Sequence, residues 1–422
     1  MYKKYYELKE SLRKEIMDRI GVDKDWDDEE IARLIDEVIF EQGKNQYIST
    51  ATKLTLKQEL FNAIRRLDVL QELIDDPAIT EIMVNGAGSI FYEKDGNLHR
   101  WHKKFESNEK LEDVIQQIVS RSNRQVNTSS PIVDTSLDDG SRVNVVLKPV
   151  ALNGPILTIR KFPKKPITMD DLLEWGSISE EAMNFLKKMV MAGYNIFISG
   201  GTGTGKTTIL NVLANYIPKD ERVITVEDTA ELQIGSIDNL VRLEVRNANS
   251  DGTGEITIRD LVKSALRMRP NRIIIGEVRG AEAIDLLQAM NTGHNGSIST
   301  GHSNSIEDMI SRLETMVMMG SDIPLKAIRK QIASSIDIFI QLGRLRDKTR
   351  RIVEISEVNC MEGEEIILNS LYRFVEDESS YQQGCLRETG SYGKMPKVRG
   401  RLTPTGNTLI HRQKLVDAAI SL

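Results

Sequence analysis

A glycine-rich segment at residues 200–208 constrains the fold of this chain more than any other stretch. It consists of Gly200, Gly201, Thr202, Gly203, Thr204, Gly205, Lys206, Thr207 and Thr208. A short apolar run precedes it and a helical apolar pattern follows, which is the strand–loop–helix context of a phosphate loop. Glycines let backbone N–H groups converge on phosphate oxygens, Lys206 can reach the outer phosphates, and Thr207 offers a hydroxyl to Mg²⁺. A glycine-rich turn without a ligand is the plainer alternative, but the filled positions favour binding of a nucleoside triphosphate.

The composition sets the broad class of the protein. The chain has 422 residues, of which 28% are charged, and a net charge of −6. Its length predicts two or three domains, and its acidic balance argues against non-specific nucleic-acid binding. Two cysteines, Cys360 and Cys385, fit a reducing cytosol. No window approaches the roughly 20 apolar residues of a membrane span, so we expect a cytoplasmic protein that meets a membrane only through partners.

Changes in hydrophobic period divide the chain into four parts. Residues 1–75 have helical spacing, with Thr55 and Gln58 expected to cap a third helix. Residues 76–162 alternate like an α+β domain built on a β-meander, and residues 163–176 are expected to be a linker. Residues 177–422 alternate helix and strand, which predicts an α/β domain with a mostly parallel sheet. From about residue 358 short strand-like pieces mixed with turns predict a C-terminal extension.

Acidic residues follow two of the predicted strands of this domain. Glu227 follows Val223–Val226 with Glu231 close behind, and Glu277 follows Arg272–Ile275. Catalytic side chains collect at the carboxyl ends of such strands. Hydrolysis of a triphosphate needs a positioned water and a metal bridging the phosphates, so either Glu277 or Glu227 could orient the water or hold the Mg²⁺ shell. A helix cap or a solvated turn is the alternative for each residue.

Histidines and an arginine accompany these carboxylates. His302 follows the predicted strand Ser297–Thr300, and His294 precedes it. Their ring N–H groups could sense the γ-phosphate, although a structural histidine is the simpler reading. Arg279 is one of several arginines that could act as a finger across a subunit boundary, whereas most such residues form surface ion pairs.

Four ordered motifs resemble those of one family, the type II/type IV secretion ATPase superfamily. The Walker A, Asp-box, Walker B and His-box motifs of that superfamily are matched by residues 200–208, 224–232, 266–280 and 292–305. Within it, the chain is most similar to the CpaF branch of tight-adherence (Flp) pilus ATPases, a likeness that residues 76–86, 139–144 and 157–162 extend. The four-cysteine zinc insert of type II secretion members is absent, which favours the CpaF or conjugation-type branch.

This resemblance implies a RecA-like domain that hydrolyses ATP with Mg²⁺, in a homohexameric ring that drives a membrane-embedded pilus or secretion platform protein. Each nucleotide would lie between the N-terminal and ATPase domains, with Arg142 and Arg160 reaching its phosphates. The remaining site residues implied by the resemblance are Lys206, Thr207 and Thr208 of Walker A, Glu227 and Glu231 of the Asp box, Glu277 of Walker B, and His294 and His302 of the His box. Because Walker B carries a glutamate where many phosphate-loop enzymes carry an aspartate, the expected contact of Glu277 with Mg²⁺ is through water rather than direct.

Three other functions are compatible with a phosphate loop. A nucleic-acid motor would be stimulated by single-stranded DNA, a small-molecule kinase would transfer phosphate to an acceptor, and a regulatory switch would bind nucleotide with negligible turnover. No nucleic acid is expected as a partner, given the acidic net charge.

Overall fold

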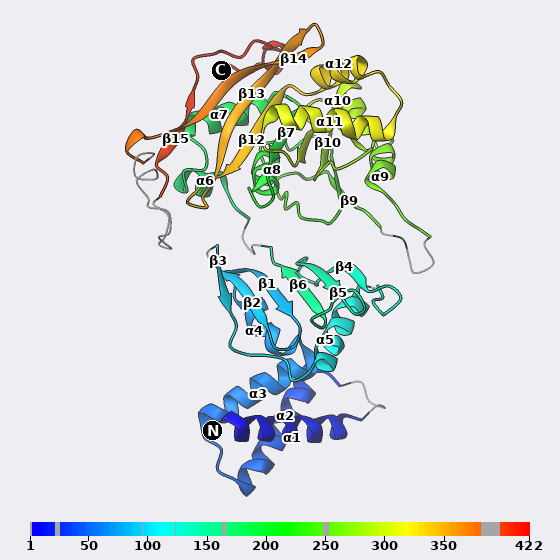
Figure 1. Ribbon diagram of the computed structural model, residues 1–422, viewed down its shortest axis with the longest axis vertical. Coiled ribbons are helices and arrows are strands. Elements are labelled where there is room, and N and C mark those ends of the chain that lie inside the picture. The colour runs from blue at the N-terminus through cyan, green and yellow to red at the C-terminus, as the bar shows by residue number, and fades with distance from the viewer. Residues whose placement is uncertain are drawn as a thin grey trace. The chain divides into compact units, whose positions relative to one another are not determined.

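The computed structural model describes residues 2–21, 26–94, 96–122, 124–162, 166–246, 248, 253–380 and 397–422. Residues 163–165 of the expected linker and Cys385 lie outside the described residues. The chain forms two compact units, Met1–Lys164 and Lys165–Leu422, which are described in turn (Figure 1).

Three helices begin the first unit. They are α1 (Tyr2–Ile20), α2 (Asp28–Asn45) and α3 (Thr50–Arg65). A capping box starts α2, because the Asp27 side chain accepts from the backbone N–H of Glu30 and the Glu30 side chain accepts from that of Asp27. The three helices bury one shared core, with Leu12, Ile35 and Leu60 among its fully covered residues. Amphipathic spacing therefore produces a small bundle.

The expected cap of the third helix is wrong. Ser49 is the N-cap of α3, and its side chain accepts a hydrogen bond from the N–H of Thr52. Thr55 lies inside the helix, where its hydroxyl donates to the carbonyl of Ala51 at 3.1 Å. The helix extends further toward the N-terminus than the Thr55–Gln58 pair suggests, because Ser49 already satisfies a free N–H group of its first turn.

A six-stranded antiparallel sheet follows these helices in the first unit, in the order β3-β2-β1-β6-β5-β4. Its strands are β1 (Ile79–Asn85), β2 (Ile90–Lys94), β3 (Asn97–Arg100), β4 (Ile132–Ser136), β5 (Arg142–Val146) and β6 (Ile156–Arg160). The helix α5 (Asn108–Arg121) contributes five buried apolar residues to a core shared with alternate residues of these strands.

The core of this sheet also includes residues that precede the predicted domain boundary at residue 75. A short 3₁₀ turn, η1 (Asp68–Leu70), and α4 (Gln71–Asp75) carry Leu70 and Leu73, which are buried in it together with Leu67. The boundary between the helices and the α+β part therefore lies before Leu67, because tertiary packing rather than helical spacing decides which core a helix joins.

The second unit is built on a nine-stranded sheet within the described residues, in the order β15-β14-β13-β12-β7-β11-β10-β8-β9. The strands are β7 (Ile196–Gly200), β8 (Val223–Glu227), β9 (Leu240–Glu244), β10 (Arg272–Ile275), β11 (Ile298–Gly301), β12 (Ile338–Arg344), β13 (Arg350–Glu362), β14 (Glu365–Glu376) and β15 (Gly400–Pro404). Neighbours from β9 to β12 pair in parallel, and the remaining pairs are antiparallel. The predicted mostly parallel α/β sheet is confirmed.

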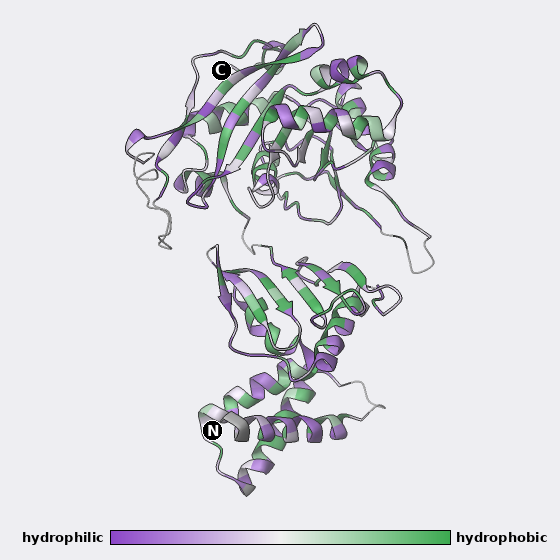
Figure 2. Cartoon of the chain, viewed as in Figure 1, coloured by the Kyte–Doolittle hydropathy of each residue, from purple (hydrophilic) through white to green (hydrophobic). Residues whose placement is uncertain are grey.

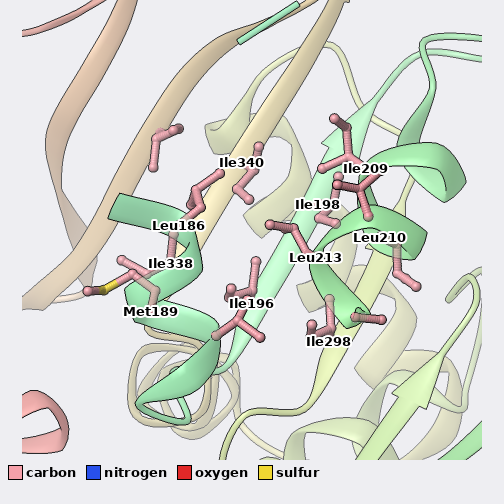
Figure 3. Close-up of a cluster of buried hydrophobic side chains, with 14 of the residues drawn as sticks. Leu186, Met189, Ile196, Ile198, Ile209, Leu210, Leu213, Ile298, Ile338 and Ile340 are labelled. Atoms are coloured by element: carbon pink, nitrogen blue, oxygen red, sulfur yellow. The ribbon is translucent and has the colours of Figure 1, made fainter. Parts of the chain in front are cut away.

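Helices cover both faces of this sheet. Successive side chains of β7 point to opposite faces, and all of them are buried, so both faces need a covering layer. The helices are α6 (Met169–Glu174), α7 (Glu180–Met191), α8 (Lys206–Ala214), α9 (Ile258–Ala265), α10 (Ala283–Asn291), α11 (Ile306–Gly320), α12 (Leu325–Ser335) and α14 (Gln413–Asp417). Ile196 and Ile198 pack with α7 and α8 (Figure 3), whereas Phe197 packs with α9 to α12 on the other face. Hydrophobic residues accordingly concentrate on the central strands (Figure 2).

Two expectations for this unit need correction. The predicted linker 163–176 contains α6, which a capping box of Thr168 and Asp171 begins and whose Met169 and Leu172 are buried. The predicted extension from about residue 358 begins inside β13, and β13 and β14 are long strands rather than short pieces. Described residues of both segments pack on the core of the sheet, a contribution that local spacing does not reveal.

Candidate nucleotide-binding site

The phosphate loop lies between the fully buried strand β7 and the helix α8. Gly203 has φ +69° and Gly205 has φ +96°, a left-handed region that glycine enters without strain. Gly205 is the N-cap of α8 and supplies no capping side chain, so the backbone N–H groups of the first turn stay available for an anion. The hydroxyl of Thr204 donates to the Gly201 carbonyl at 2.9 Å and holds the loop in shape.

Close packing fixes where the loop begins. A Cβ on Gly200 would lie 2.7 Å from Oγ1 of Thr204 and 2.9 Å from the carbonyl oxygen of Leu342 on the neighbouring strand β12. Only glycine fits without displacing backbone, so β12 sets the path of the loop.

The loop lysine belongs to a chain of charged and polar side chains. Nζ of Lys206, which is 7% exposed, lies 3.1 Å from the Gly201 carbonyl and 3.1 Å from Nδ1 of His302. Nε2 of His302 lies 2.9 Å from Oε1 of Glu277, and Arg279 donates to Oε2 of the same carboxylate at 2.9 Å. The structure therefore brings together Lys206, His302, Glu277 and Arg279.

Neighbouring charges keep the carboxylate of Glu277 ionised. Burial alone would raise the pKa of Glu277, but the hydrogen bond from Arg279 and the charges of Arg279, His302 and Lys206 outweigh it and lower that pKa. Burial lowers the pKa of His302, and the charge of Glu277 only partly offsets this effect. A carboxylate and a neutral imidazole therefore stand beside the phosphate loop near neutral pH.

Glu227 has a different environment from Glu277. It is 3% exposed, and its Oε1 accepts from the backbone N–H groups of Glu231 and Leu232, both at 2.8 Å. Its Oε2 is buried without a hydrogen-bond partner in the described part of the chain. Burial raises the pKa of Glu227 to about 7, although those two backbone hydrogen bonds oppose the rise. Glu227 anchors the loop that carries Glu231.

The structure does not bring His294 to this cluster. It precedes β11, whereas His302 follows it, so the two histidines lie at opposite ends of that strand. Nδ1 of His294 lies 3.2 Å from the carbonyl oxygen of Ala289 near the end of α10, and its own carbonyl accepts from the hydroxyl of Ser297. His294 and His302 are close in sequence, but the extended strand β11 runs between them and places them at its opposite ends.

Residue patterns did not identify two polar residues that lie near the loop. Asn211 of α8 accepts from the N–H of Gln233 at 2.8 Å and so ties α8 to the loop after β8. Gln341 is 4% exposed on β12, beside β7. The only sequence signal for Gln341 is an amide within the apolar run 338–342.

Arg142 and Arg160 lie opposite each other on β5 and β6 of the first unit. They fall on the sheet face opposite the one buried by Val143 and Ile159, and Glu81 faces Arg160 from the other side. Two basic residues therefore occupy directly opposed positions on this face of the sheet.

The residues beside the phosphate loop suit Mg²⁺ that arrives with a nucleotide. Among the described residues, no three His, Cys, Asp or Glu side chains gather into a preformed metal site. Mg²⁺ on a nucleotide takes most of its ligands from phosphates and water, and it needs only one or two protein oxygens. Thr207 and the ionised Glu277 are of that kind.

Nowhere in the described chain is there a helix both long and apolar enough for a membrane crossing.

The parallel sheet and its phosphate loop define a RecA-like nucleotide-binding fold. The ATPase DotB of Legionella pneumophila has a similar structure, with a TM-score of 0.50 and 23% identity over 69% of this chain and 80% of that one. The pilus retraction motor PilT, solved with bound ADP, is similar at a TM-score of 0.51 and 18% identity, over 72% and 81% of the two chains. At these identities the likeness concerns the fold.

Sequence comparison identifies the family. Residues 65–402 match the family model described as type II/IV secretion system protein, and the chain belongs to that family. A Mycobacterium tuberculosis protein named for conjugal transfer is 35% identical over 303 residues, which are 70% of this chain and 85% of that protein. The type IV secretion system protein PtlH of Bordetella pertussis is 31% identical over 315 residues, 68% of this chain and 93% of PtlH.

Proposed function

We propose that this protein is a Mg²⁺-dependent ATPase that powers pilus assembly or protein secretion. The observation that carries the proposal is the contact chain from Lys206 of the phosphate loop through His302 to Glu277. It links a cation that can neutralise phosphate to a carboxylate that can orient water. Membership of the secretion family supports the biological role.

The roles of the site residues follow from their chemistry. The backbone N–H groups of 201–206 and Lys206 would hold the β- and γ-phosphates, with Thr207 as the protein ligand of Mg²⁺, which would neutralise charge on the phosphates when bound. Glu277, kept ionised, would accept a hydrogen bond from the attacking water, and His302 would report the state of the γ-phosphate to Lys206 and Glu277. Glu227 and Glu231 would shape the Asp-box loop, and Arg279 would fix the orientation of Glu277.

The larger assembly is also part of the proposal. The chain would act as a homohexamer of the CpaF type, with Arg142 and Arg160 contacting the nucleotide phosphates from the N-terminal domain. Closure of the two domains over ATP would then move a membrane-embedded platform protein from the cytoplasmic side. The paired arginines at opposed positions of β5 and β6 support an anion-binding role for that face.

Phosphate release tests the chemical half of this proposal. Wild type and Glu277→Gln are compared with ATP and Mg²⁺, and light scattering after size exclusion records the particle mass. Glu314→Gln is the matched control, because Glu314 is likewise paired with an arginine, Arg329, but lies on α11. We expect turnover by wild type and Glu314→Gln, a loss of about 10²–10⁴-fold in Glu277→Gln, and nucleotide binding in all three.

The same measurement separates the alternatives. Particles of about six subunits without a response to DNA support the secretion motor. A monomer whose turnover rises on single-stranded DNA or on a small phosphoryl acceptor contradicts it, and equal turnover by Glu277→Gln contradicts the assigned chemistry.

A further inference from the structure

Gln341 is a buried amide for which the proposed chemistry has so far given no role. It lies on β12, which pairs in parallel with β7 so that Gln341 stands opposite Ser199 and Leu342 opposite Gly200. Gln341 is thus next to the strand residue that immediately precedes the phosphate loop. An uncharged polar side chain at 4% exposure must satisfy its donors and acceptors inside the protein.

The two ends of this amide hold two different segments. Its Oε1 accepts a hydrogen bond from the hydroxyl of Ser199. Its Nε2 donates to the carbonyl oxygen of Asn304 at 3.1 Å and lies 3.5 Å from that of Ser303. One side chain therefore joins the base of the phosphate loop to the segment directly after His302.

His302 is held from both sides as a result. On its N-terminal side, Gly301 pairs with Ser199 in the sheet. On its C-terminal side, Gln341 fixes the backbone of residues 303–304. Between these two attachments the imidazole lies 3.1 Å from Nζ of Lys206 and 2.9 Å from Oε1 of Glu277.

We propose that Gln341 is a positioning residue for ATP hydrolysis, whose amide fixes the segment after β11 so that His302 reaches Lys206 and Glu277 together. This inference rests on the proposed ATPase function. Gln341 acts through His302, because its amide holds protein groups at the base of the phosphate loop and in residues 303–304. A displacement of about 1 Å in such a group can lower a rate by about a hundredfold.

The local strand geometry is consistent with this role. The pairing of β12 with β13 shifts register between Gln341 and Leu342. Such bulges are frequent next to active sites, where they re-aim a side chain. Here the extra residue is Val353 of β13, which lies across from the step between Gln341 and Leu342, the residue whose carbonyl limits position 200 to glycine.

The first test replaces the amide with an unbranched apolar side chain of similar length, Gln341→Met. We expect kcat for phosphate release to fall about tenfold to a hundredfold, while ATP affinity changes less than about threefold. In a His302→Ala background the same substitution should cost nothing further, because both changes remove one function. Additive losses, or an unchanged kcat, would overturn the proposal.

The matched control is Asn195, which immediately precedes the neighbouring strand β7, at the end away from the phosphate loop. Asn195 is 2% exposed, and its amide also bridges backbone groups, accepting from Gly296 and donating to Ser335. Asn195→Leu should lower stability but leave kcat unchanged below the unfolding temperature. If Asn195→Leu lowers kcat as much as Gln341→Met does, general destabilisation explains both and the proposal fails.

A second measurement does not depend on turnover. Diethylpyrocarbonate labels histidines, and peptide mass spectrometry reports each site separately in the nucleotide-free protein. Gln341→Met should speed labelling of His302 several-fold and leave His99 and His411 unchanged. Unchanged labelling of His302 overturns the proposal. If wild type binds ATP without turnover, the ATPase proposal fails, and this labelling comparison alone still decides the role of Gln341.

Discussion

Nε2 of His302 lies 2.9 Å from Oε1 of Glu277, while Nδ1 of the same ring faces Nζ of Lys206 at 3.1 Å. Because an ammonium group only donates, Nδ1 accepts from Lys206, and in the neutral ring Nε2 carries the proton. The contact of Nε2 with Glu277 is close but not aligned as a hydrogen bond, since Oε1 has no hydrogen-bond partner among the described residues. One neutral imidazole with this tautomer therefore connects the phosphate-binding lysine to the carboxylate of the Walker B position. The lowered pKa of His302 has its main cause in burial and is consistent with this state.

His302→Ala should lower kcat for phosphate release by about a hundredfold and change ATP affinity much less, because Lys206 and the loop N–H groups remain. Steady-state phosphate release and binding of a fluorescent ATP analogue measure the two effects. His411→Ala is the control, since Nε2 of His411 contacts the carbonyl of Asn359 on β13. A loss confined to affinity would show that His302 only helps to bind nucleotide.

Glu227 should make stability depend on pH. Its pKa is raised from 4.5 to about 7 in the folded protein, so the folded state binds more protons than the unfolded state between these values. Stability therefore falls as pH rises through this window, by about 3 kcal/mol in total. Glu227→Gln keeps an acceptor for the two backbone N–H groups and removes the charge.

Thermal unfolding between pH 5 and pH 8 measures this effect. The midpoint of Glu227→Gln should rise relative to wild type as pH increases, whereas Glu365→Gln, at an exposed glutamate of β14, should follow wild type. Parallel curves for Glu227→Gln and wild type would mean that Glu227 is ionised at little cost.

Arg272 supports the opposite end of the sheet. It is 2% exposed, forms two hydrogen bonds with the carboxylate of Glu221, and donates to the carbonyl of Val190. Arg272→Met should destabilise the protein by about 3 kcal/mol, because it leaves the partly buried Glu221 charge without its partner. Urea unfolding measures the loss, and ATP affinity at low temperature should stay unchanged. A stability equal to wild type would show that the pair merely balances its desolvation cost.

Glu59 should tie the helical bundle to the α+β part of the first unit. Its Oε2 lies 3.0 Å from Nζ of Lys9 in α1, and its Oε1 lies 2.8 Å from Nζ of Lys103, which follows β3. Glu59→Gln removes the carboxylate beside the buried ammonium group of Lys9, whereas Lys103 keeps its contact with Glu72 at 2.6 Å. Hydrogen exchange should then increase in α1 and α3 but not in β1 or β6. Asp36→Asn, at an exposed pair with Lys57, is the control. Unchanged exchange would assign the attachment to apolar packing alone.

The sequence by itself determined the local chemistry of the protein. The glycine and lysine pattern of 200–208 requires a strand, a loop and a helix in that order, and the structure has β7 and α8 on either side. Apolar strands that end in Glu227, Glu277 and His302 also follow from residue spacing, since buried parallel strands are almost continuously apolar. These properties depend on neighbouring residues in the chain, which a pattern can report.

Tertiary structure decided which of these residues meet. His302 reaches Lys206 because β11 pairs with β7, and His294 is excluded because it enters the same strand from the other end. Gln341 reaches the phosphate-loop strand across 142 positions of sequence, and α6 and β13 join the sheet although their local patterns suggested a linker and short pieces. Contacts between distant segments depend on strand order and on packing into a shared core, and neither is encoded in the spacing of neighbouring residues.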